Sequence, residues 1–98
     1  MNTILLEEKH LKIVQQILED LKVTDWVYGL RVKNKAHTFS DLDQCIIENY
    51  EKSIITKLKY AFVESDLPFK VDVLVWSDLS NAFKKHIEKE LVKFNEIF

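Results

Sequence analysis

The chain has few of the residues that interrupt, crosslink or anchor a fold. Its 98 residues include one glycine, one proline and one cysteine, and no long apolar run. Cys45 alone cannot form an intrachain disulfide and leaves a zinc site without its usual ligands, so we expect a reducing, cytoplasmic setting. Because neither a signal peptide nor an apolar stretch of membrane-spanning length is visible, we expect no association with a membrane.

Neither sign of charge dominates the composition. There are 14 Lys and Arg against 16 Asp and Glu, a formal net charge of -2. This balance gives no overall basic field of the kind that attracts nucleic acid, so we expect no direct nucleic-acid binding. With 47% hydrophobic and 11% aromatic residues, the chain can build one core, and we predict a single domain over residues 1–98.

Apolar periodicity predicts three helices. Apolar residues recur at intervals of three and four between Glu7 and Lys22 and again between Glu51 and Glu64, which is the pattern of an amphipathic helix. Either Ser77 or Asp78 can cap a third helix. Its apolar residues Leu79, Phe83, Ile87 and Leu91 repeat every four positions. Phe94 and Phe98 continue this apolar stripe to the chain end.

Three segments have the aromatic and β-branched content of strands. They are "DWVYGLRV" (residues 25–32), "DLDQCII" (41–47) and "FKVDVLVW" (69–76). The predicted order is therefore helix, strand, strand, helix, strand, helix, which is an α+β chain with a small sheet.

Three aspartates of these strands are candidates for a metal site. Side chains alternate along a strand, so Asp41 and Asp43 share one face with Cys45. Asp72 stands among valines, where a carboxylate needs a compensating charge. A divalent cation would compensate all three carboxylates, although the Asp41–Asp43 pair taken alone is also compatible with a solvated strand end.

The only glycine lies where the first predicted strand meets a polar loop. Gly29 would permit close approach of the backbone to a ligand and supply N–H donors for phosphate oxygens. A plain tight turn is the alternative. Arg31, Lys33 and Lys35 follow and could contact phosphate, Arg31 with the better geometry, unless this basic loop is simply solvated.

These residues resemble a known signature. "YGLRVKNKAHTFSDLD" (28–43) resembles the G-S-x10-D-x-D motif of the nucleotidyltransferase superfamily typified by DNA polymerase β, and specifically of its minimal nucleotidyltransferases (MNT). "ESDLPFKVDVLVW" (64–76) is similar to the strand that carries the third carboxylate of that family, and "SDLSNAFKKHIEKELV" (77–92) to its closing helix. The resemblance covers the chain from about Trp26 onward and implies the polymerase β-like fold with a mixed sheet.

The resemblance also implies a site. Asp41 and Asp43 would bind Mg2+, with two ions expected during turnover. Asp72 would complete the metal site and help to activate the acceptor hydroxyl. Gly29 with Leu30 would hold the phosphates of ATP or another nucleoside triphosphate.

Leu30 departs from the family motif, which has serine there. Loss of a donor at a phosphate-transfer site costs about 2 to 4 kcal/mol of transition-state stabilisation, by analogy with oxyanion donors. Two functions therefore stay open. The first is Mg2+-dependent transfer of AMP from ATP to a hydroxyl; the resemblance implies a HEPN-domain partner in a hetero-oligomer, with this chain as an antitoxin that adenylylates a tyrosine of the HEPN toxin. The second is an impaired family member that binds nucleotide or partner without turnover.

Overall fold

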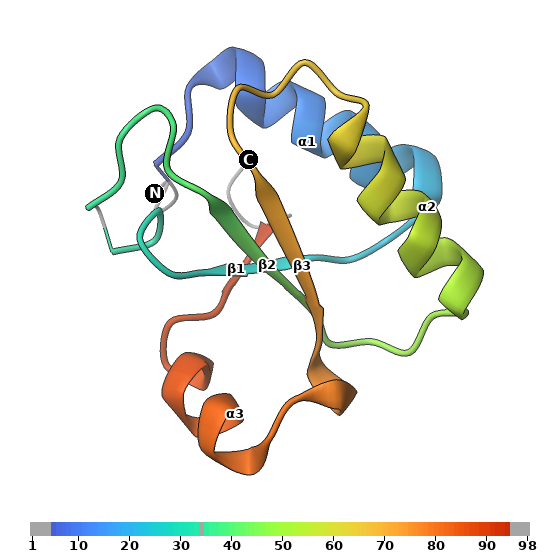
Figure 1. Cartoon of the computed structure of the whole chain (residues 1–98), viewed down its shortest axis with the longest axis vertical. Coiled ribbons are helices and arrows are strands. Elements are labelled where there is room, and N and C mark those ends of the chain that lie inside the picture. Colours follow the sequence, from blue (N-terminus) through green and yellow to red (C-terminus); the bar gives the residue numbers. More distant parts are fainter. Residues whose placement is uncertain (1–4, 34, 95–98) are drawn as a thin grey trace.

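The computed structural model describes residues 5–33 and 35–94 (Figure 1). Within these residues there are three α-helices, four strands and one short 3-10 helix, η1. The elements are α1 (Glu8–Leu21), β1 (Trp26–Tyr28), β2 (Leu42–Ile46), α2 (Lys52–Val63), β3 (Val71–Val75), η1 (Trp76–Asp78), α3 (Asn81–Glu88) and β4 (Val92–Lys93).

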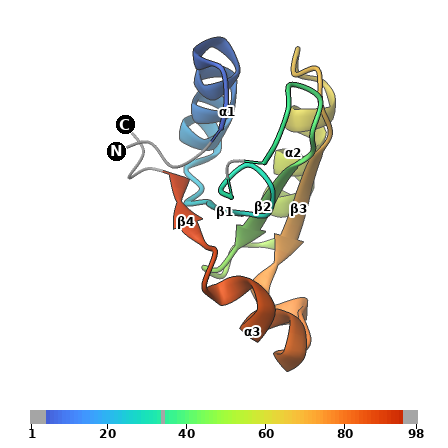
Figure 2. The same ribbon diagram turned by 90° about the vertical axis from the view of Figure 1, so that its left-hand side faces the viewer.

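The strands form one mixed sheet in the order β3-β2-β1-β4. β1 runs antiparallel to both β2 and β4, whereas β2 and β3 are parallel. The parallel pair is joined through α2, because parallel strands need a long crossover. Helices α1 and α2 lie together on one side of the sheet, and α3 lies beyond the end of β3 (Figures 1 and 2). The α+β class predicted from the sequence is confirmed.

The hydrophobic core fills the space between the sheet and the first two helices. Alternate strand residues point into it, and each helix contributes its apolar stripe. The buried residues of this cluster include Val27, Leu42, Ile46 and Val73 from the strands, Val14 and Leu18 from α1, and Leu58 and Phe62 from α2. One face of the sheet is therefore committed to packing, which leaves the other available for chemistry.

The first two helices agree with the sequence pattern. α1 and α2 each begin one residue after the predicted start and end one residue before the predicted end. Lys22 closes α1 in the left-handed conformation, with φ of 57°, and its N–H donates to the carbonyls of Leu18 and Glu19. Within the described residues, no helix combines the length and the apolar character required to cross a bilayer.

The first strand is shorter than predicted. Residues 25–32 were expected to be extended, but β1 ends at Tyr28. Gly29 has φ of 85°, and the N–H groups of Val32 and Lys33 both donate to its carbonyl at 3.2 Å. The chain therefore leaves the sheet in a tight turn at its only glycine, since a positive φ ends the extended conformation.

The third helix begins later and ends earlier than predicted. Its N-cap is Ser80, whose Oγ accepts the N–H of Phe83 at 3.1 Å. Ser77 and Asp78, the predicted caps, instead belong to η1. The apolar repeat that was assigned to one long helix is divided, because α3 stops at Glu88 and the residues after it enter the sheet.

The chain after α3 forms a fourth strand that the sequence pattern did not predict. β4 pairs with β1, matching Val92 with Val27, and so covers an edge that would otherwise leave backbone groups unpaired. Phe94 is fully buried in the core and its N–H donates to the Asp25 carbonyl at 2.9 Å. Burial of a Phe side chain stabilises by about 2 to 3 kcal/mol, which favours this packing over a longer helix. Phe98 lies outside the described residues.

Candidate active site

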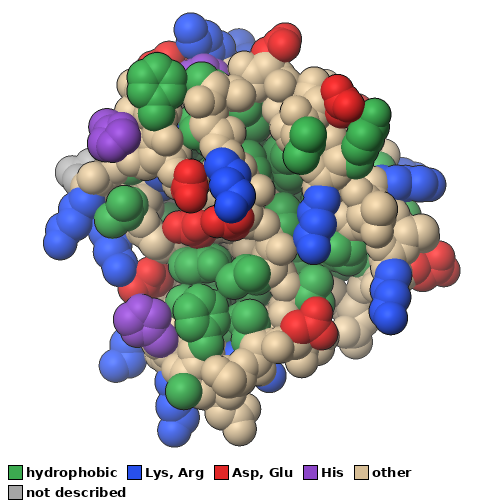
Figure 3. All heavy atoms as spheres, viewed as in Figure 1, with side chains coloured by type: hydrophobic (Ala, Val, Ile, Leu, Met, Phe, Trp, Pro, Cys, Tyr) green, Lys and Arg blue, Asp and Glu red, His purple; other side chains and the backbone are tan. Residues whose placement is uncertain are grey.

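Two of the three predicted aspartates lie side by side on the sheet. Asp43 of β2 is the register partner of Asp72 of β3. Paired residues of parallel neighbours point to the same face and lie about 4.8 Å apart across the ladder. Asp41 immediately precedes β2. The face that carries them is opposite to the helix-packed core, and acidic side chains gather near the centre of the view in Figure 3.

Burial and neighbouring acidic side chains raise the pKa of Asp43. The pKa of Asp43 is raised to about 6, first by burial and then by the negative charges of Asp72, Asp41 and Glu90, while Arg31 opposes the rise. Such a group of like charges is what a divalent cation would offset.

The carboxylates are not yet arranged around one point. Lys70 forms an ion pair with Asp72, with Nζ 3.2 Å from Oδ1. In the described parts of the chain, no group of three or more His, Cys, Asp and Glu side chains is already placed to hold a metal ion. The donor set of two paired carboxylates and a third nearby fits Mg2+, which prefers oxygen ligands and retains waters.

Gly29 is required at its position for two independent reasons. Its φ of 85° is unfavourable for residues with a Cβ. A Cβ added there would also collide with Oδ2 of Asp43 and would lie 3.3 Å from its Cγ. The glycine therefore lets the turn approach the Asp43 carboxylate closely. The glycine and the aspartates of the predicted motif thus lie next to each other.

Both donors of this turn hold the carboxylate of Glu90, a residue that the sequence reasoning missed. The Gly29 N–H donates to Oε1 at 3.1 Å, and Lys33 Nζ lies 2.9 Å from Oε2. Although burial acts to raise it, the pKa of Glu90 is lowered by the hydrogen bonds from Lys33 and from the Gly29 backbone. Nothing in the local sequence brings residue 90 to residue 29; only the pairing of β4 with β1 does so.

Leu30 stands on the turn without entering the core. Its side chain is 48% exposed, and its carbonyl accepts the N–H groups of Lys33 and Lys35. The turn is therefore held by backbone bonds that do not involve the Leu30 side chain. The leucine replaces the family hydroxyl without being needed for packing.

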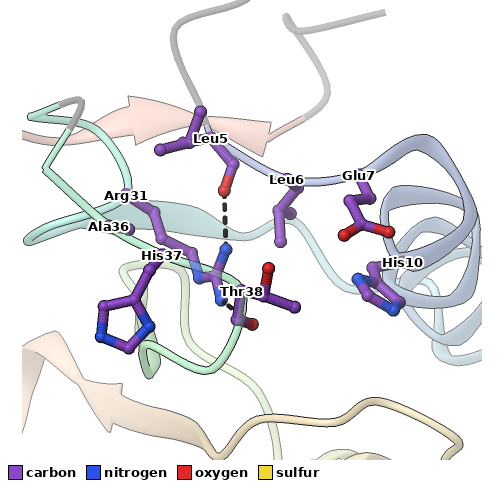
Figure 4. Close-up of a pocket in the computed structure, with 8 residues that line it drawn as sticks. All are labelled: Leu5, Leu6, Glu7, His10, Arg31, Ala36, His37 and Thr38. Carbon is purple, nitrogen blue, oxygen red and sulfur yellow. Dashed lines mark hydrogen bonds between the residues drawn. The ribbon is translucent and has the colours of Figure 1, made fainter.

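Arg31 has a structural role in this geometry. The side chain is buried. It donates to the Leu5 carbonyl from Nη1 at 2.7 Å and to the Thr38 carbonyl from Nη2 at 3.0 Å (Figure 4). It also donates to the Ser40 carbonyl from Nε at 3.1 Å and from Nη2 at 2.6 Å. The guanidinium also lies 4.2 Å from the centroid of the Phe69 ring. The predicted phosphate contact does not fit this arrangement, because Arg31 would first have to give up the bonds that close the loop ahead of Asp41.

A cavity of about 310 Å3 lies beside Arg31. Leu5, Leu6 and His10 line it from the start of α1, and His37 lines it from the loop before β2 (Figure 4). Its lining contains none of the three aspartates. It is therefore separate from the carboxylate site, with Arg31 between the two.

Tyr28 lies on the carboxylate face of the sheet. It is the register partner of Asp43 across β1 and β2. Its ring packs edge-on against Phe83 of α3, with centroids 6.3 Å apart. Burial, followed by the charge of Asp43, raises the pKa of the phenol. The Tyr28–Phe83 contact thus joins the acidic face of the sheet to α3.

The fold and this acidic face define a class of protein. Residues 7–94 match the family model described as nucleotidyltransferase domain, and the chain belongs to that family. Its α+β architecture agrees with the polymerase β-like fold of the family.

Among individual proteins, the chain is 41% identical over 95 residues to "Probable protein adenylyltransferase MntA" of Haemophilus influenzae (strain ATCC 51907 / DSM 11121 / KW20 / Rd). The match covers 93% of this chain and 83% of that protein. The resemblance to minimal nucleotidyltransferases is therefore confirmed.

Proposed function

We propose that the chain transfers AMP from ATP to a protein hydroxyl at the carboxylate face. Membership of the nucleotidyltransferase family supports nucleotidyl transfer, and the name of the H. influenzae relative supports adenylyl transfer to protein. The observation that carries the proposal is the Asp43–Asp72 register pair, with the Gly29 turn packed directly against Asp43. This places carboxylates beside backbone donors suited to phosphate.

The residues divide the reaction between them. In the transfer, the acceptor oxygen bonds to the α-phosphorus as the bond to pyrophosphate breaks, and the hydroxyl proton must leave. Asp72 would receive that proton and complete the metal site, Asp41 and Asp43 would hold the cation, and the Gly29–Leu30 turn would hold phosphate oxygens. When bound at these carboxylates, Mg2+ would supply charge neutralisation of the triphosphate and a lowered pKa of the acceptor hydroxyl.

A HEPN-domain protein is the proposed acceptor, with one of its tyrosines as the modified residue and this chain as the antitoxin of the pair. The resemblance to minimal nucleotidyltransferases supports this proposal. The name of the H. influenzae relative, a probable protein adenylyltransferase, supports a protein as the acceptor. The carboxylate face fits such an acceptor, because Asp72 is only partly buried, with 39% of its side chain exposed. A tyrosine carried on a partner would therefore reach it without a rearrangement of the core.

Binding without turnover is the second candidate. Two observations favour it: Leu30 supplies no hydroxyl to the turn, and Glu90 already accepts the Gly29 N–H. In that case the chain would neutralise its partner by contact alone. The presence of Asp41, Asp43 and Asp72, with Asp43 and Asp72 paired across the ladder, favours the enzyme.

Radiolabelled ATP tests the proposal. The chain is incubated with Mg2+, a HEPN-domain protein as the proposed acceptor, and ATP labelled at either the α- or the γ-phosphate. We expect label from the α-phosphate on the partner and none from the γ-phosphate. Asp72→Asn should remove the labelling, and Asp66→Asn, which changes an exposed aspartate after α2, should not. Labelling from γ, or equal labelling by Asp72→Asn, would reject adenylyl transfer at this site.

A further inference from the structure

One carboxylate of the chain occupies the anion-binding donors of the glycine turn. Glu90 accepts the Gly29 N–H through Oε1 and the Lys33 ammonium through Oε2. A backbone N–H and an ammonium that converge on one pair of oxygens form a binding site for an oxyanion. The glutamate is mostly shielded, with 18% of its side chain exposed, whereas 41% of the Lys33 side chain is exposed. The site therefore opens to solvent on the lysine side.

The strand register explains why Glu90 reaches this turn. β1 and β4 pair Trp26 with Lys93 and Val27 with Val92. Continued by two residues, the same antiparallel register sets Glu90 opposite Gly29. The Glu90 N–H donates to the Ile87 carbonyl at 2.9 Å, so the residue also closes the end of α3. The contact is therefore specified by the fold.

A nucleotide phosphate and Glu90 cannot use the same donors together. Both are anionic, and both would receive the Gly29 N–H. Glu90 also faces the acidic pair, since its charge acts on Asp43. A polyphosphate that arrives with a cation would neutralise this region, whereas Glu90 adds to its negative charge.

We propose that Gly29 and Lys33 form a polyphosphate subsite that Glu90 occupies in the free protein, and that a nucleoside triphosphate must displace Glu90 to bind. The proposal rests on the proposed function for the identity of the ligand. It assigns two roles that the family motif does not contain: Lys33 as a phosphate ligand and Glu90 as an internal competitor.

The single glycine makes the contact directly observable. Labelling the full chain with 15N-glycine gives one backbone amide resonance, that of Gly29. The resonance is followed during titration with inorganic triphosphate, without metal, in the wild type and in Glu90→Ala, Glu90→Gln and Lys33→Met. Glu88→Gln serves as the matched control, since it removes the same charge from an exposed position two residues away.

Removal of the competitor should strengthen binding. If Glu90 holds the subsite for about nine-tenths of the time, its removal lowers the apparent Kd about tenfold. We expect that shift for Glu90→Ala, a smaller one for Glu90→Gln, which keeps an acceptor for Gly29, and a weaker affinity than wild type for Lys33→Met. Glu88→Gln should match the wild type. Should the alanine variant fail to fold, the glutamine variant still gives the direction.

Other outcomes would overturn the proposal. An unchanged or higher Kd in both Glu90 variants would make Glu90 a structural support for the turn. A Gly29 resonance that no concentration of triphosphate moves in any variant would show that the subsite takes no polyphosphate. Because this readout needs no acceptor and no turnover, it is separable from the transfer assay. Transfer can fail while the Gly29 titration succeeds, and the reverse can also occur.

Discussion

The two faces of the sheet are built from the same strands but differ in role: one packs in the core and the other carries the paired aspartates. On the helix-covered face, Leu42 and Ile46 of β2 are fully buried. On the other face, Asp43, between them in sequence, meets Asp72 across the parallel ladder. A change of one residue along the strand therefore moves from apolar packing to a repelling pair of charges. The packed face supplies the stability that lets the acidic face keep unfavourable charges for function.

The largest expected effect separates activity from stability on the acidic face. Asp43→Asn should lower the rate of AMP transfer by about a thousandfold or more, equivalent to about 4 kcal/mol, because a cation ligand is lost. The midpoint of urea unfolding without metal should stay the same or rise, since like charges are relieved. If the transfer rate of Asp43→Asn falls only in proportion to the fraction of unfolded protein, the two faces do not differ in role.

A substitution on the packed face should do the opposite and affect stability more than activity. Leu42→Ala should lower the free energy of unfolding by about 2 to 5 kcal/mol, because it leaves a cavity in the core. Urea denaturation followed by circular dichroism measures it. At a concentration of denaturant where both proteins stay folded, we expect the transfer rate per folded molecule to change much less than in Asp43→Asn. Full inactivation of the folded Leu42→Ala protein would show that the faces are not independent.

A smaller effect is expected at the turn. Leu30→Ser should raise AMP transfer about tenfold, because about 1.4 kcal/mol of recovered stabilisation gives that factor. Since the Leu30 side chain is 48% exposed, the thermal midpoint should change little. In an Asp41→Asn background the serine should restore nothing. No gain from serine under conditions where the wild type is active would mean that backbone donors already suffice.

The smallest effect is a pH dependence of stability without metal. The pKa of Asp43 is raised from 3.8 to about 6 in the folded protein, so the folded state binds the proton more tightly. The free energy of unfolding contributed by this group therefore falls as pH rises from about 4 to about 6. Allowing for solvent screening, we expect Asp43→Asn to gain about 1 kcal/mol over the wild type between these limits. Urea titrations in EDTA at pH 4, 5, 6 and 7 test it, and parallel curves would contradict it.

Local pattern was sufficient for the parts of the molecule that depend on near neighbours. Periodicity located α1 and α2 within a residue at each end, and strand alternation assigned Leu42 and Asp43 to opposite faces. The tight turn at Gly29, one of the two interpretations that the sequence allowed, is confirmed, whereas its contact with phosphate stays a prediction. The close approach that requires glycine there involves Asp43, fourteen positions away.

Features that depend on distant pairing were not accessible. The predicted extent of α3 was wrong because residues 92–93 pair with β1 as strand β4. The apolar pattern around Val92 is equally compatible with a helix. Arg31 looked like a phosphate ligand because its charge was visible and the three carbonyls that bind it were not. Glu90 was invisible for the same reason, since only the β1–β4 register sets it against Gly29.

Intact-protein mass spectrometry of the partner tests the central claim most directly, namely that the Asp43–Asp72 face transfers AMP. The HEPN-domain protein is incubated with ATP, Mg2+ and either the wild-type chain, Asp72→Asn, or the Asp66→Asn control. We predict that the partner gains the mass of AMP with the wild type and with Asp66→Asn, and that it gains none with Asp72→Asn. A partner that stays unmodified with both the wild type and Leu30→Ser, or that is modified equally by Asp72→Asn, would contradict the account.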